Sequence, residues 1–429
     1  MLSAADNATI TQVGPGTACG ELFRRFWLPA LVPSEVPHPD SDPIRLRLLG
    51  EDLIAFRDTN GRVGIIQNNC PHRGASLFFG RNEEAGIRCV YHGWKFDVSG
   101  QCVDMPNEPA ESDFKSKVRT TAYPTREWGG VIWVFMGPAE LASELPQFEW
   151  ARVPDDQRCV GKYVVEANYL QVLEGSLDSS HLGFLHRWLN APPQDKTPRF
   201  FTLNTDFGVT IAARRNVADD DDAYYWRLTQ MLLPCWAMIP AAPGGNISIV
   251  GAVPIDDTHT YSWKIIWSVK DPFTAEQIAG AWTGSDWSGS RSGDGPPAVR
   301  PIGISYPMLQ SGTLLPAANA RNDYRIDRQV QRTRTFSGIP GVSEQDLAVQ
   351  ESMGAICDRP KEHLGSSDLG IIATRRRILQ AAEALQKGEE PHAAQHPELF
   401  HVRSVAQNLR RDQNYETAPE IAAASAAQI

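Results

Sequence analysis

Hydrophobic residues alternate with polar ones over several short runs in the first third of the 429-residue chain. Runs of this period and length predict β-strands, because successive side chains of a strand point to opposite faces. Asn60-Gly61 lies between two of the runs and is typical of a tight hairpin turn. The predicted strands are Arg45–Leu49, Leu53–Arg57, Val63–Gln67, Arg88–Tyr91, Lys95–Val98 and Val131–Phe135. We therefore expect a small antiparallel β domain over residues 43–150.

A proline- and acid-rich stretch, Pro138–Pro154, separates this region from a longer one of mixed periodicity. Helices are predicted there over Ala167–Leu189, Ser343–Asp358 and Thr374–Gln386, and strands over Phe207–Arg214, Tyr225–Leu233, Asn246–Val253 and Tyr261–Val269. Asp286–Pro297 predicts a loop, and the last dozen residues predict a loosely held tail. The expected class is α+β, with an N-terminal segment (1–42) that contains a helix around Glu21–Trp27, the β domain (43–150) and a larger domain (151–429).

Composition narrows the class of partner. Hydrophobic residues make up 42% and charged residues 21% of the chain, which is ordinary for a globular protein. The formal net charge of −10 argues against nucleic acid and anionic membranes as partners, since both attract basic proteins. No stretch resembles a secretory signal or a transmembrane helix, so the expected location is the cytoplasm. Five of the seven cysteines are scattered, and we expect free thiols there.

Two cysteine–histidine pairs carry the most specific signal: Cys70 with His72, and Cys89 with His92. Two thiolates and two imidazoles suit a [2Fe–2S] cluster in which cysteines bind one iron and histidines the other. The same residue types also bind zinc. Zinc motifs usually keep cysteine with cysteine and histidine with histidine, whereas each half here holds one of each. The pattern therefore favours the iron–sulfur cluster and predicts a protein that carries electrons.

A second group of metal-ligating residue types lies at Asp178, His181 and His186. Two histidines and one carboxylate can hold a mononuclear iron and leave positions open for O2. A spacing of five residues places the two imidazoles about 140° apart around a regular helix, so we expect the helix to bend, most easily at Gly183. Asp178 is better placed to accept a hydrogen bond from an imidazole than to bind the metal. The alternative is a set of ordinary polar residues on a helix surface.

The carboxylate ligand is then expected from a distant part of the chain. The segment from Ser343 to Ser352 offers Glu344, Asp346 and Glu351, and spacing does not choose among them. Ser343 with Asp346 also reads as a helix start of the capping-box kind, which is a purely structural role. From the residues alone, the third ligand stays open.

With both motifs in this order, the chain resembles the α-subunits of Rieske non-haem iron oxygenases, in particular the phthalate dioxygenase-like group. The resemblance covers nearly the whole chain and includes Gly14–Thr17, Tyr91–Lys95, Asn168–Gln171, Glu174-Gly175, Gln345-Asp346, Val349–Gly354 and Leu364–Asp368. It implies a [2Fe–2S] cluster held by Cys70, His72, Cys89 and His92, and a mononuclear iron held by His181, His186 and Asp346. It also implies a catalytic role for Asp178, which would connect His181 to His92 of the partner subunit by hydrogen bonds.

The resemblance further implies fold, partners and reaction. The fold would be an antiparallel β Rieske domain and a helix-grip (START/Bet v1-like) catalytic domain, assembled as a homotrimer that in some members stacks into a hexamer. A flavin- or ferredoxin-type reductase would supply electrons from NADH, with O2 as co-substrate. The expected reaction is hydroxylation of an aromatic acid of phthalate or benzoate type. Oxidative O-demethylation or N-dealkylation of a methoxylated or substituted aromatic compound is the alternative, and a non-catalytic electron-transfer protein is a third.

Substrate recognition depends on residues that the motifs do not identify. An aromatic carboxylate would pair with an arginine. The candidates are Arg187, Arg214, Arg215 and Arg227, and the alternative for each is a solvated surface position. An aromatic ring could pack against Trp188, Trp226, Trp236, Trp263 or Trp267, although most of these are expected in the hydrophobic core.

Overall fold

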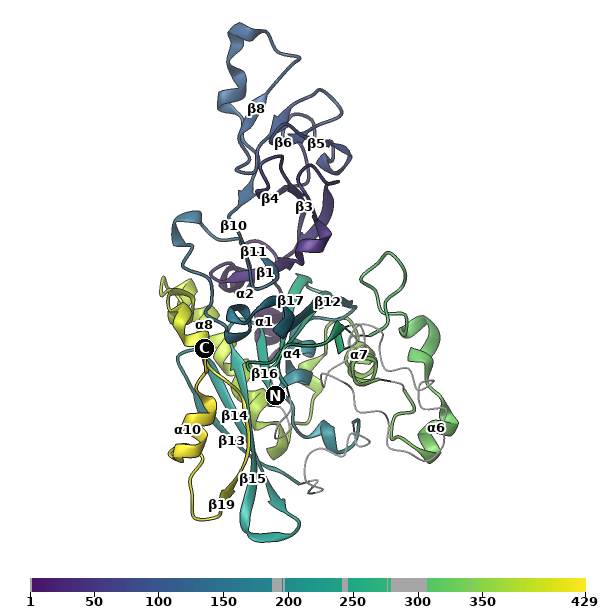
Figure 1. Ribbon diagram of the computed structural model, residues 1–429, viewed down its shortest axis with the longest axis vertical. Helices are drawn as coiled ribbons and strands as arrows, with labels where there is room; N and C mark the ends of the chain where they lie inside the picture. Colours follow the sequence, from purple (N-terminus) through teal and green to yellow (C-terminus); the bar gives the residue numbers. More distant parts are fainter. Residues whose placement is uncertain are drawn as a thin grey trace.

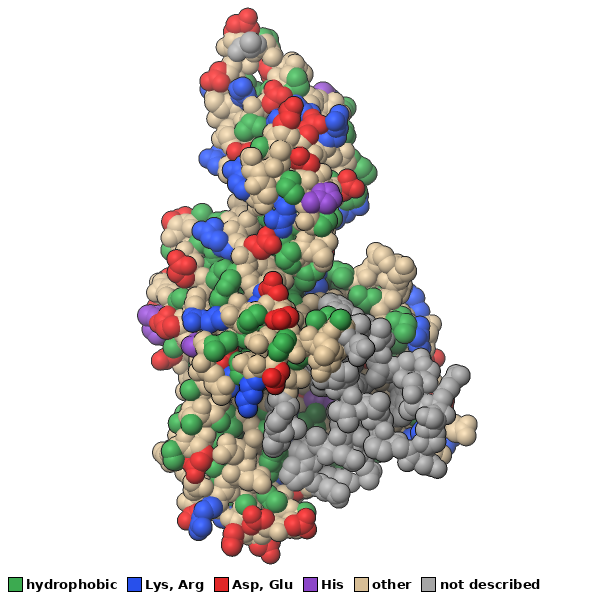
Figure 2. Space-filling model, viewed as in Figure 1, with side chains coloured by type: hydrophobic (Ala, Val, Ile, Leu, Met, Phe, Trp, Pro, Cys, Tyr) green, Lys and Arg blue, Asp and Glu red, His purple; other side chains and the backbone are tan. Residues whose placement is uncertain are grey.

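The computed structural model describes residues 2–186, 195, 197–240, 246–275, 277–278, 307–339 and 341–429. A narrow domain of short strands projects from one end of a larger domain, which holds the long strands and the long helix α8 (Figure 1). Acidic and basic side chains are interspersed over the face in Figure 2, without a field of one sign. The predicted division at residues 42 and 150 stays a prediction.

The projecting domain consists of two four-stranded antiparallel sheets, with the orders β2-β3-β4-β9 and β5-β6-β7-β8. The strands are β2 Ile44–Leu48, β3 Glu51–Arg57, β4 Val63–Gln67, β5 Arg81–Glu83, β6 Gly86–Arg88, β7 Lys95–Phe96, β8 Cys102–Asp104 and β9 Ala122–Tyr123. Apolar side chains, among them Phe56, Ile66 and Phe96, form a core that also contains Cys70 and Cys89. The cysteines are therefore fixed by packing as well as by their loops.

The strands predicted in this domain are present, and their bounds differ from the predicted ones by at most two residues except for one strand. The strand predicted over Arg88–Tyr91 lies earlier, at β6, because Cys89 already begins a turn. The predicted hairpin at Asn60-Gly61 joins β3 and β4, and Gly61 adopts the positive φ of +79° that such turns require.

A three-stranded antiparallel sheet, β1-β11-β10, joins the two domains. Its strands are β1 Trp27–Leu31, β10 Thr125–Trp128 and β11 Val131–Phe135, and the preceding helices are α1 Ala4–Thr11 and α2 Ala18–Phe23. The helix predicted over Glu21–Trp27 begins earlier because the Thr17 hydroxyl accepts a hydrogen bond from the Gly20 amide. It ends earlier because Trp27 pairs with Phe135 at the start of β1.

The larger domain is built on one antiparallel sheet with the order β12-β18-β17-β16-β15-β14-β13, and β19 also pairs with β15. The strands are β12 Arg158–Val165, β13 Arg199–Asn204, β14 Gly208–Val217, β15 Asp220–Leu232, β16 Trp236–Ile239, β17 Ile247–Asp256, β18 His259–Trp267 and β19 Val405–Arg410. The described α-helices are α3 Glu149–Arg152, α4 Tyr169–Leu177, α6 Arg328–Thr333, α7 Val342–Ser352, α8 Leu369–Gln386, α9 His392–Gln395 and α10 Pro419–Ser425.

Helices α4 and α8 pack against the large sheet, α4 on β16 and β17 and α8 on β13 and β14. This sheet gripping its helices, together with the small antiparallel sheets, confirms the predicted α+β class. Three of the candidate tryptophans, Trp236, Trp263 and Trp267, are almost completely buried in the core between these layers. They are part of the hydrophobic core, and each buries roughly 150–250 Å² of surface there.

The predicted end of one helix and the predicted loose tail are wrong. The helix predicted over Ser343–Asp358 ends at Ser352, and Gly354 follows with a positive φ of +87° that a helix does not contain. The last dozen residues are not loose, because Ile421 of α10 is buried and the Gln428 amide donates to the Glu149 carboxylate at 2.6 Å.

The loop predicted over Asp286–Pro297 lies outside the described residues. In the part of the chain that the structure describes, no helix is both long enough and apolar enough to cross a membrane.

Candidate metal centres

The two cysteine–histidine loops of the projecting domain have the same backbone conformation. In each loop, the backbone amide of the cysteine donates a hydrogen bond to the carbonyl five residues later. The carbonyl of the same cysteine accepts a hydrogen bond from the glycine amide four residues later, and all these bonds are 2.8–3.0 Å long. The glycines, Gly74 and Gly93, have φ of +75° and +80°. A Cβ on Gly93 would also lie 2.5 Å from Pro106 Cγ. The loops of Cys70 and Cys89 are therefore equivalent although their cysteine–histidine spacings differ.

The side chains of these loops converge. The Cys70 and Cys89 thiols are both buried, and burial raises the pKa of Cys70 to about 11, with the neighbouring Cys89 adding to the shift. The rings of His72 and His92 lie with their centroids 4.5 Å apart, and His72 stacks on Trp94 at 4.2 Å. The structure thus brings together all four side chains that the sequence singled out.

The donor set fits a cluster of two irons better than one zinc ion. The ligand atoms of a single-ion site must all lie close to one another. Among the described residues, only one group of three or more possible ligands has all its donor atoms within 4.8 Å, and it does not include Cys70 or His92. Two thiols on the buried side and two imidazoles on the partly exposed side instead match a group whose two irons take different ligands.

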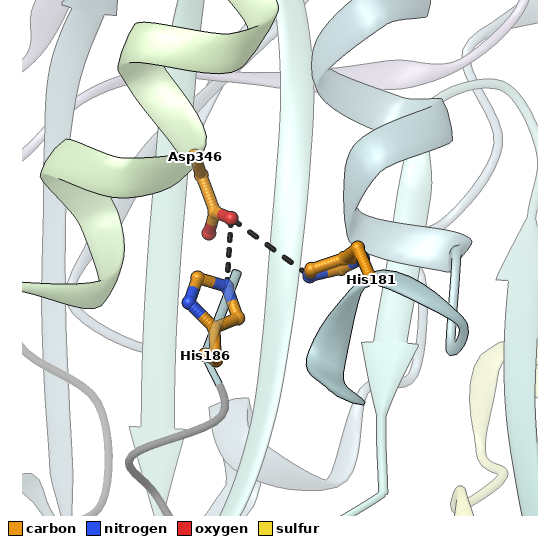
Figure 3. A group of neighbouring side chains, drawn as sticks. All are labelled: His181, His186 and Asp346. Atoms are coloured by element: carbon orange, nitrogen blue, oxygen red, sulfur yellow. Dashed lines mark hydrogen bonds and ion pairs between the residues drawn. The ribbon is translucent and has the colours of Figure 1, made fainter. Parts of the chain in front are cut away.

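That one group consists of His181, His186 and Asp346, the second set expected from the sequence (Figure 3). Helix α4 ends at Leu177, and His181 lies in a short 3-10 turn, His181–Gly183. Asp346 comes from the middle of α7, and its carboxylate points to both imidazoles, whose centroids are 4.9 Å apart. Residues far apart in the sequence therefore converge on one point between α4 and α7.

The expected distortion of a continuous helix at Gly183 is wrong, because the helix stops before His181. Asp178 leaves the helix with extended backbone, and its carboxylate accepts from the backbone amides of Ser180 at 2.6 Å and His181 at 3.3 Å. A side chain that turns back on these amides ends α4 and starts the turn. The turn, rather than a bulge, brings His181 and His186 to the same side.

Each histidine has its Nδ1 engaged and its Nε2 directed at Asp346. His181 Nδ1 lies 3.3 Å from Asp178 Oδ2, and its Nε2 lies 3.8 Å from Asp346 Oδ1. His186 Nδ1 lies 2.7 Å from Gln345 Oε1, and its Nε2 lies 2.8 Å from Asp346 Oδ1. Sequence reasoning found Asp178 but missed the role of Gln345, although Gln345-Asp346 was part of the quoted motif.

Charges within the group stabilise one another. Burial alone would raise the pKa of Asp346, but the imidazoles of His186 and His181 reverse this and lower it. Burial alone would lower the pKa of His181, but Asp178 and Asp346 reverse this and raise it. One carboxylate facing two imidazole Nε2 atoms is the donor set that non-haem Fe(II) prefers, so these residues fit such an ion.

The other two acids left open by the sequence are engaged elsewhere. Glu351 accepts from the Glu166 amide at 2.9 Å and from the Tyr324 hydroxyl at 2.6 Å. Glu344 lies in the first turn of α7 against Gly341.

The capping-box interpretation of Ser343 is wrong. The N-cap of α7 is Gly341, with φ of +81°, and the Ser343 hydroxyl accepts from Lys264 Nζ at 2.6 Å. Ser343 is thus already inside the helix, where its side chain ties α7 to the adjacent β18.

A single glutamine ties the two helices of the site together. The Gln171 amide of α4 donates to the carbonyls of Gln350 and Gly354 at 2.9 and 2.8 Å, and its oxygen accepts from the Cys357 amide at 2.8 Å. These three bonds fix the end of α7 against α4. They hold Asp346 at a constant distance from the turn that carries His181.

Two arginines lie on the same sheet face beside the histidines. In the register of β14 and β15, Arg215 pairs with Tyr225 and Arg227 with Ala213, which makes the arginines diagonal neighbours. Arg215 donates to the Ser179 carbonyl at 2.7 Å. The charge of Arg227 opposes protonation of His181 and so acts to lower the pKa of that imidazole. Burial lowers the pKa of Arg215 to about 10, and the charge of Arg227 adds to this shift.

This pair is rich in unused donors. Arg215 Nη1 and Arg227 Nε have no hydrogen-bond partner among the described residues. Arg214 points to the opposite face, where its guanidinium lies 4.2 Å from the centre of the Tyr224 ring. Trp226, on the same strand as Tyr224, packs against Tyr415 in a separate small core. The remaining candidates, Arg187 and Trp188, lie outside the described residues.

Two family models match the chain. The model described as "Rieske [2Fe-2S] domain" matches residues 26–124, and the model described as "LigXa C-terminal domain like" matches residues 134–283 and 309–417. Together they span both candidate metal centres.

Characterised relatives are similar over most of their length. The phthalate 4,5-dioxygenase oxygenase subunit of Pseudomonas putida is 37% identical over 91% of this chain and 88% of its own. The 3-chlorobenzoate-3,4-dioxygenase oxygenase subunit of Comamonas testosteroni is 38% identical over 98% of both chains. The 5,5'-dehydrodivanillate O-demethylase oxygenase subunit of Sphingobium sp. is 30% identical over 100% of this chain and 92% of its own. Among solved structures, dicamba monooxygenase has the same fold, with a TM-score of 0.58, 18% identity and coverage of 85% of this chain and 99% of its own.

Proposed function

Because the chain belongs to the family of Rieske non-haem iron oxygenases, we propose that it hydroxylates an aromatic acid of the phthalate or benzoate type. Family membership makes the protein the terminal oxygenase of a multicomponent system that works with a ferredoxin or reductase. Its cofactors are a Rieske [2Fe–2S] cluster and a mononuclear iron, with O2 as co-substrate and NADH as the electron source through the reductase. The substrate class, the residue roles, the assembly and a cytoplasmic location belong to the proposal.

We assign Cys70, His72, Cys89 and His92 to the cluster and His181, His186 and Asp346 to the mononuclear iron. When bound, the cluster and the iron supply the reductive activation of O2. The protein prepares the iron site by engaging Nδ1 of both histidines, which leaves each Nε2 available as a ligand. The geometric grouping of this triad speaks against the third alternative, an electron-transfer protein without catalysis.

Exposed apolar side chains on two parts of the chain support assembly into a ring. Val90 and Tyr91, next to His92, are 59% and 53% exposed, and Val349 and Met353 of the α7 region are 39% and 48% exposed. Large apolar side chains gathered on a surface usually mark a contact with another protein. Since the two patches differ, a contact between them is head-to-tail, and such contacts form a ring when the rotation between subunits closes. A homotrimer, alone or stacked as a hexamer, is the proposed assembly.

Asp178 is the proposed link between subunits in this ring. Its Oδ2 faces the Nδ1–H of His181, and 29% of its side chain is still exposed. An exposed carboxylate edge can accept a second imidazole N–H, here from His92 of the partner subunit. One hydrogen-bonded path would then join the cluster of one subunit to the iron of the next.

The arginine pair beside the triad is the observation that carries the substrate assignment. Arg215 and Arg227 are desolvated, lie next to each other and keep unused N–H donors. Burying such cations without an anion is costly, and a carboxylate that binds two guanidinium groups relieves that cost. An anionic aromatic substrate with its ring beside His181 satisfies this requirement.

Oxidative O-demethylation or N-dealkylation is the second candidate reaction. It is supported by the 30% identity to an O-demethylase oxygenase subunit. The same triad would serve either reaction, and the arginine pair favours an anionic ring compound in both. Product analysis therefore has to separate the two.

The test combines iron analysis with a substrate panel. Purified protein should contain about three irons per chain, two in the cluster and one at the triad. With a surrogate reductase, NADH and O2, it is given benzoates, phthalates, their neutral amides and methoxylated acids. A hydroxylated acid supports the proposal, and formaldehyde from methoxylated acids supports demethylation. NADH oxidation without any oxygenated product across the panel would refute an aromatic acid as substrate.

A pair of arginine variants sharpens the test. R227Q removes one charged donor, worth about 1.5–3 kcal/mol, so KM for the acid should rise roughly 10- to 150-fold while KM for the neutral amide barely changes. R214Q is the matched control, because this neighbouring arginine faces the other side of the sheet. Equal effects of both variants would contradict a carboxylate site at Arg227.

A further inference from the structure

Two consecutive residues of α7 hold opposite nitrogens of one imidazole. His186 is almost entirely buried, with 2% of its side chain exposed. Gln345 Oε1 lies 2.7 Å from its Nδ1, and Asp346 Oδ1 lies 2.8 Å from its Nε2. Only one of the two ring nitrogens of a neutral imidazole carries a proton. The partner at Nδ1 therefore decides whether Nε2 has a lone pair for a metal.

The orientation of the Gln345 amide is fixed from its other end. Gln345 Nε2 donates to the Ile339 carbonyl oxygen at 2.8 Å. A carbonyl accepts and never donates, so the amide nitrogen has to face Ile339 and the amide oxygen has to face His186. That oxygen is in turn an acceptor only, which requires the proton of His186 to be on Nδ1. In the neutral form of His186, which is the form that binds a metal, the lone pair is then on Nε2, on the side of Asp346.

We infer that Gln345 is the positioning residue that sets the tautomer of His186 and so makes its Nε2 a metal ligand. The inference rests on the proposed iron site. Gln345 is not one of the three proposed metal ligands, and it acts through the hydrogen bond to His186 Nδ1. The position of Gln345 is set at the start of α7, where its backbone amide donates to the Gly341 carbonyl at 3.2 Å.

The two histidines are held by acceptors of different charge. Asp178 is an anion and 29% exposed, whereas Gln345 is neutral and completely buried. With Asp346 and Asp178 the site already has two carboxylates for one divalent cation. A third carboxylate at the buried position would add an uncompensated charge in the metal-free protein. A neutral amide sets the tautomer without that charge.

Ferrous-iron affinity of the triad is the direct measurement. Wild type, Q345L and Q345E are stripped of mononuclear iron, and ferrous iron is returned under anaerobic conditions in competition with a chelator. The visible spectrum of the [2Fe–2S] cluster and the melting temperature report on folding. Q345L should bind the iron roughly 10- to 100-fold more weakly, which is the usual effect of losing such a hydrogen-bond partner.

Q345E separates tautomer control from simple packing. A carboxylate still accepts from Nδ1, so iron affinity should stay within about threefold of wild type. The bond to Ile339 is lost in both variants, so a residue that merely holds that segment would weaken iron equally in Q345E and Q345L. Equal weakening, or full affinity in Q345L, would overturn the inference. Q345M replaces Q345L if the latter does not fold.

Gln350 provides a matched control on the same helix. It is also a buried glutamine, but its side chain packs near Gly175 and not against the triad. Q350L should leave iron affinity unchanged, and a loss equal to that of Q345L would overturn the assignment. A wild-type protein that takes up no iron beyond its cluster would instead refute the proposed iron site itself.

Discussion

Replacing Asp178 by asparagine tests the proposed electron path at one atom. Asp178 Oδ1 accepts the Ser180 amide at 2.6 Å, and Oδ2 accepts from the backbone amide and Nδ1 of His181, both at 3.3 Å. Asparagine keeps one oxygen and puts an NH2 group in place of the other. In D178N, either the Ser180 amide or His181 Nδ1–H must therefore face another donor. The side chain cannot satisfy both groups.

The structure sets the size of the effect. A hydrogen bond to a charged acceptor contributes about 1.5–3 kcal/mol. Because 29% of the Asp178 side chain is exposed, water recovers part of the loss, and the lower end of that range is expected for stability. The variant leaves the proposed iron ligands unchanged, so both metals should stay bound. Electron transfer from cluster to iron should slow roughly 100-fold, because His181 loses the partner that fixes its Nδ1–H.

Single-turnover kinetics measure this directly. The cluster is reduced chemically, mixed with substrate and O2, and followed by its visible absorbance while product is quantified. S180A is the control, since the Ser180 hydroxyl has no partner among the described residues and its removal leaves the Asp178 bonds intact. A wild-type rate in D178N with both metals present would refute the path. An equal loss in S180A would trace the effect to local distortion instead.

Three further outcomes follow from the structure. G93A should fail to assemble the cluster, because backbone strain at positive φ adds to a clash with Pro106 Cγ. G74A has open space around the new Cβ and should lose only about 1 kcal/mol of folding free energy. The cluster absorbance per chain checks both variants. R403M leaves the buried Glu149 carboxylate of α3 without its cationic partner. Calorimetry should therefore show that the free energy of unfolding falls by about 3–5 kcal/mol, and a change below about 1 kcal/mol would contradict this. The hydrogen bond from Arg88 lowers the pKa of Asp104 in the folded protein. The stabilising effect of this bond is therefore present above about pH 4 and is lost as the pH falls through the folded pKa. D104N should make the melting temperature depend less on pH in the acid range, and an unchanged acid dependence would contradict this.

Strand periodicity predicted those elements best whose ends are set by local turns. Val63–Gln67 and Val131–Phe135 have the predicted bounds, and each follows a turn that contains a glycine with positive φ, Gly61 or Gly130. The helix predicted over Ala167–Leu189 was too long because apolar residues continue past its true end. What ends α4 is the Asp178 carboxylate turning back on two amides, and hydrophobic spacing carries no information on such a contact.

The proposed substrate-binding arginines show most clearly what sequence spacing does not predict. Arg214 and Arg215 are adjacent on β14, so alternation alone places them on opposite faces of the sheet. Which of them lies beside the triad depends on the pairing of Arg215 with Tyr225 and on the hydrogen bond from Arg215 to the Ser179 carbonyl, neither of which is local in sequence. A slip of one residue in this register would exchange the two arginines and place an aromatic-stacked cation where the unused donors now lie. The proposed recognition of an anionic substrate therefore depends on the pairing of β14 with β15, just as the proposed iron site depends on the packing of α4 on α7.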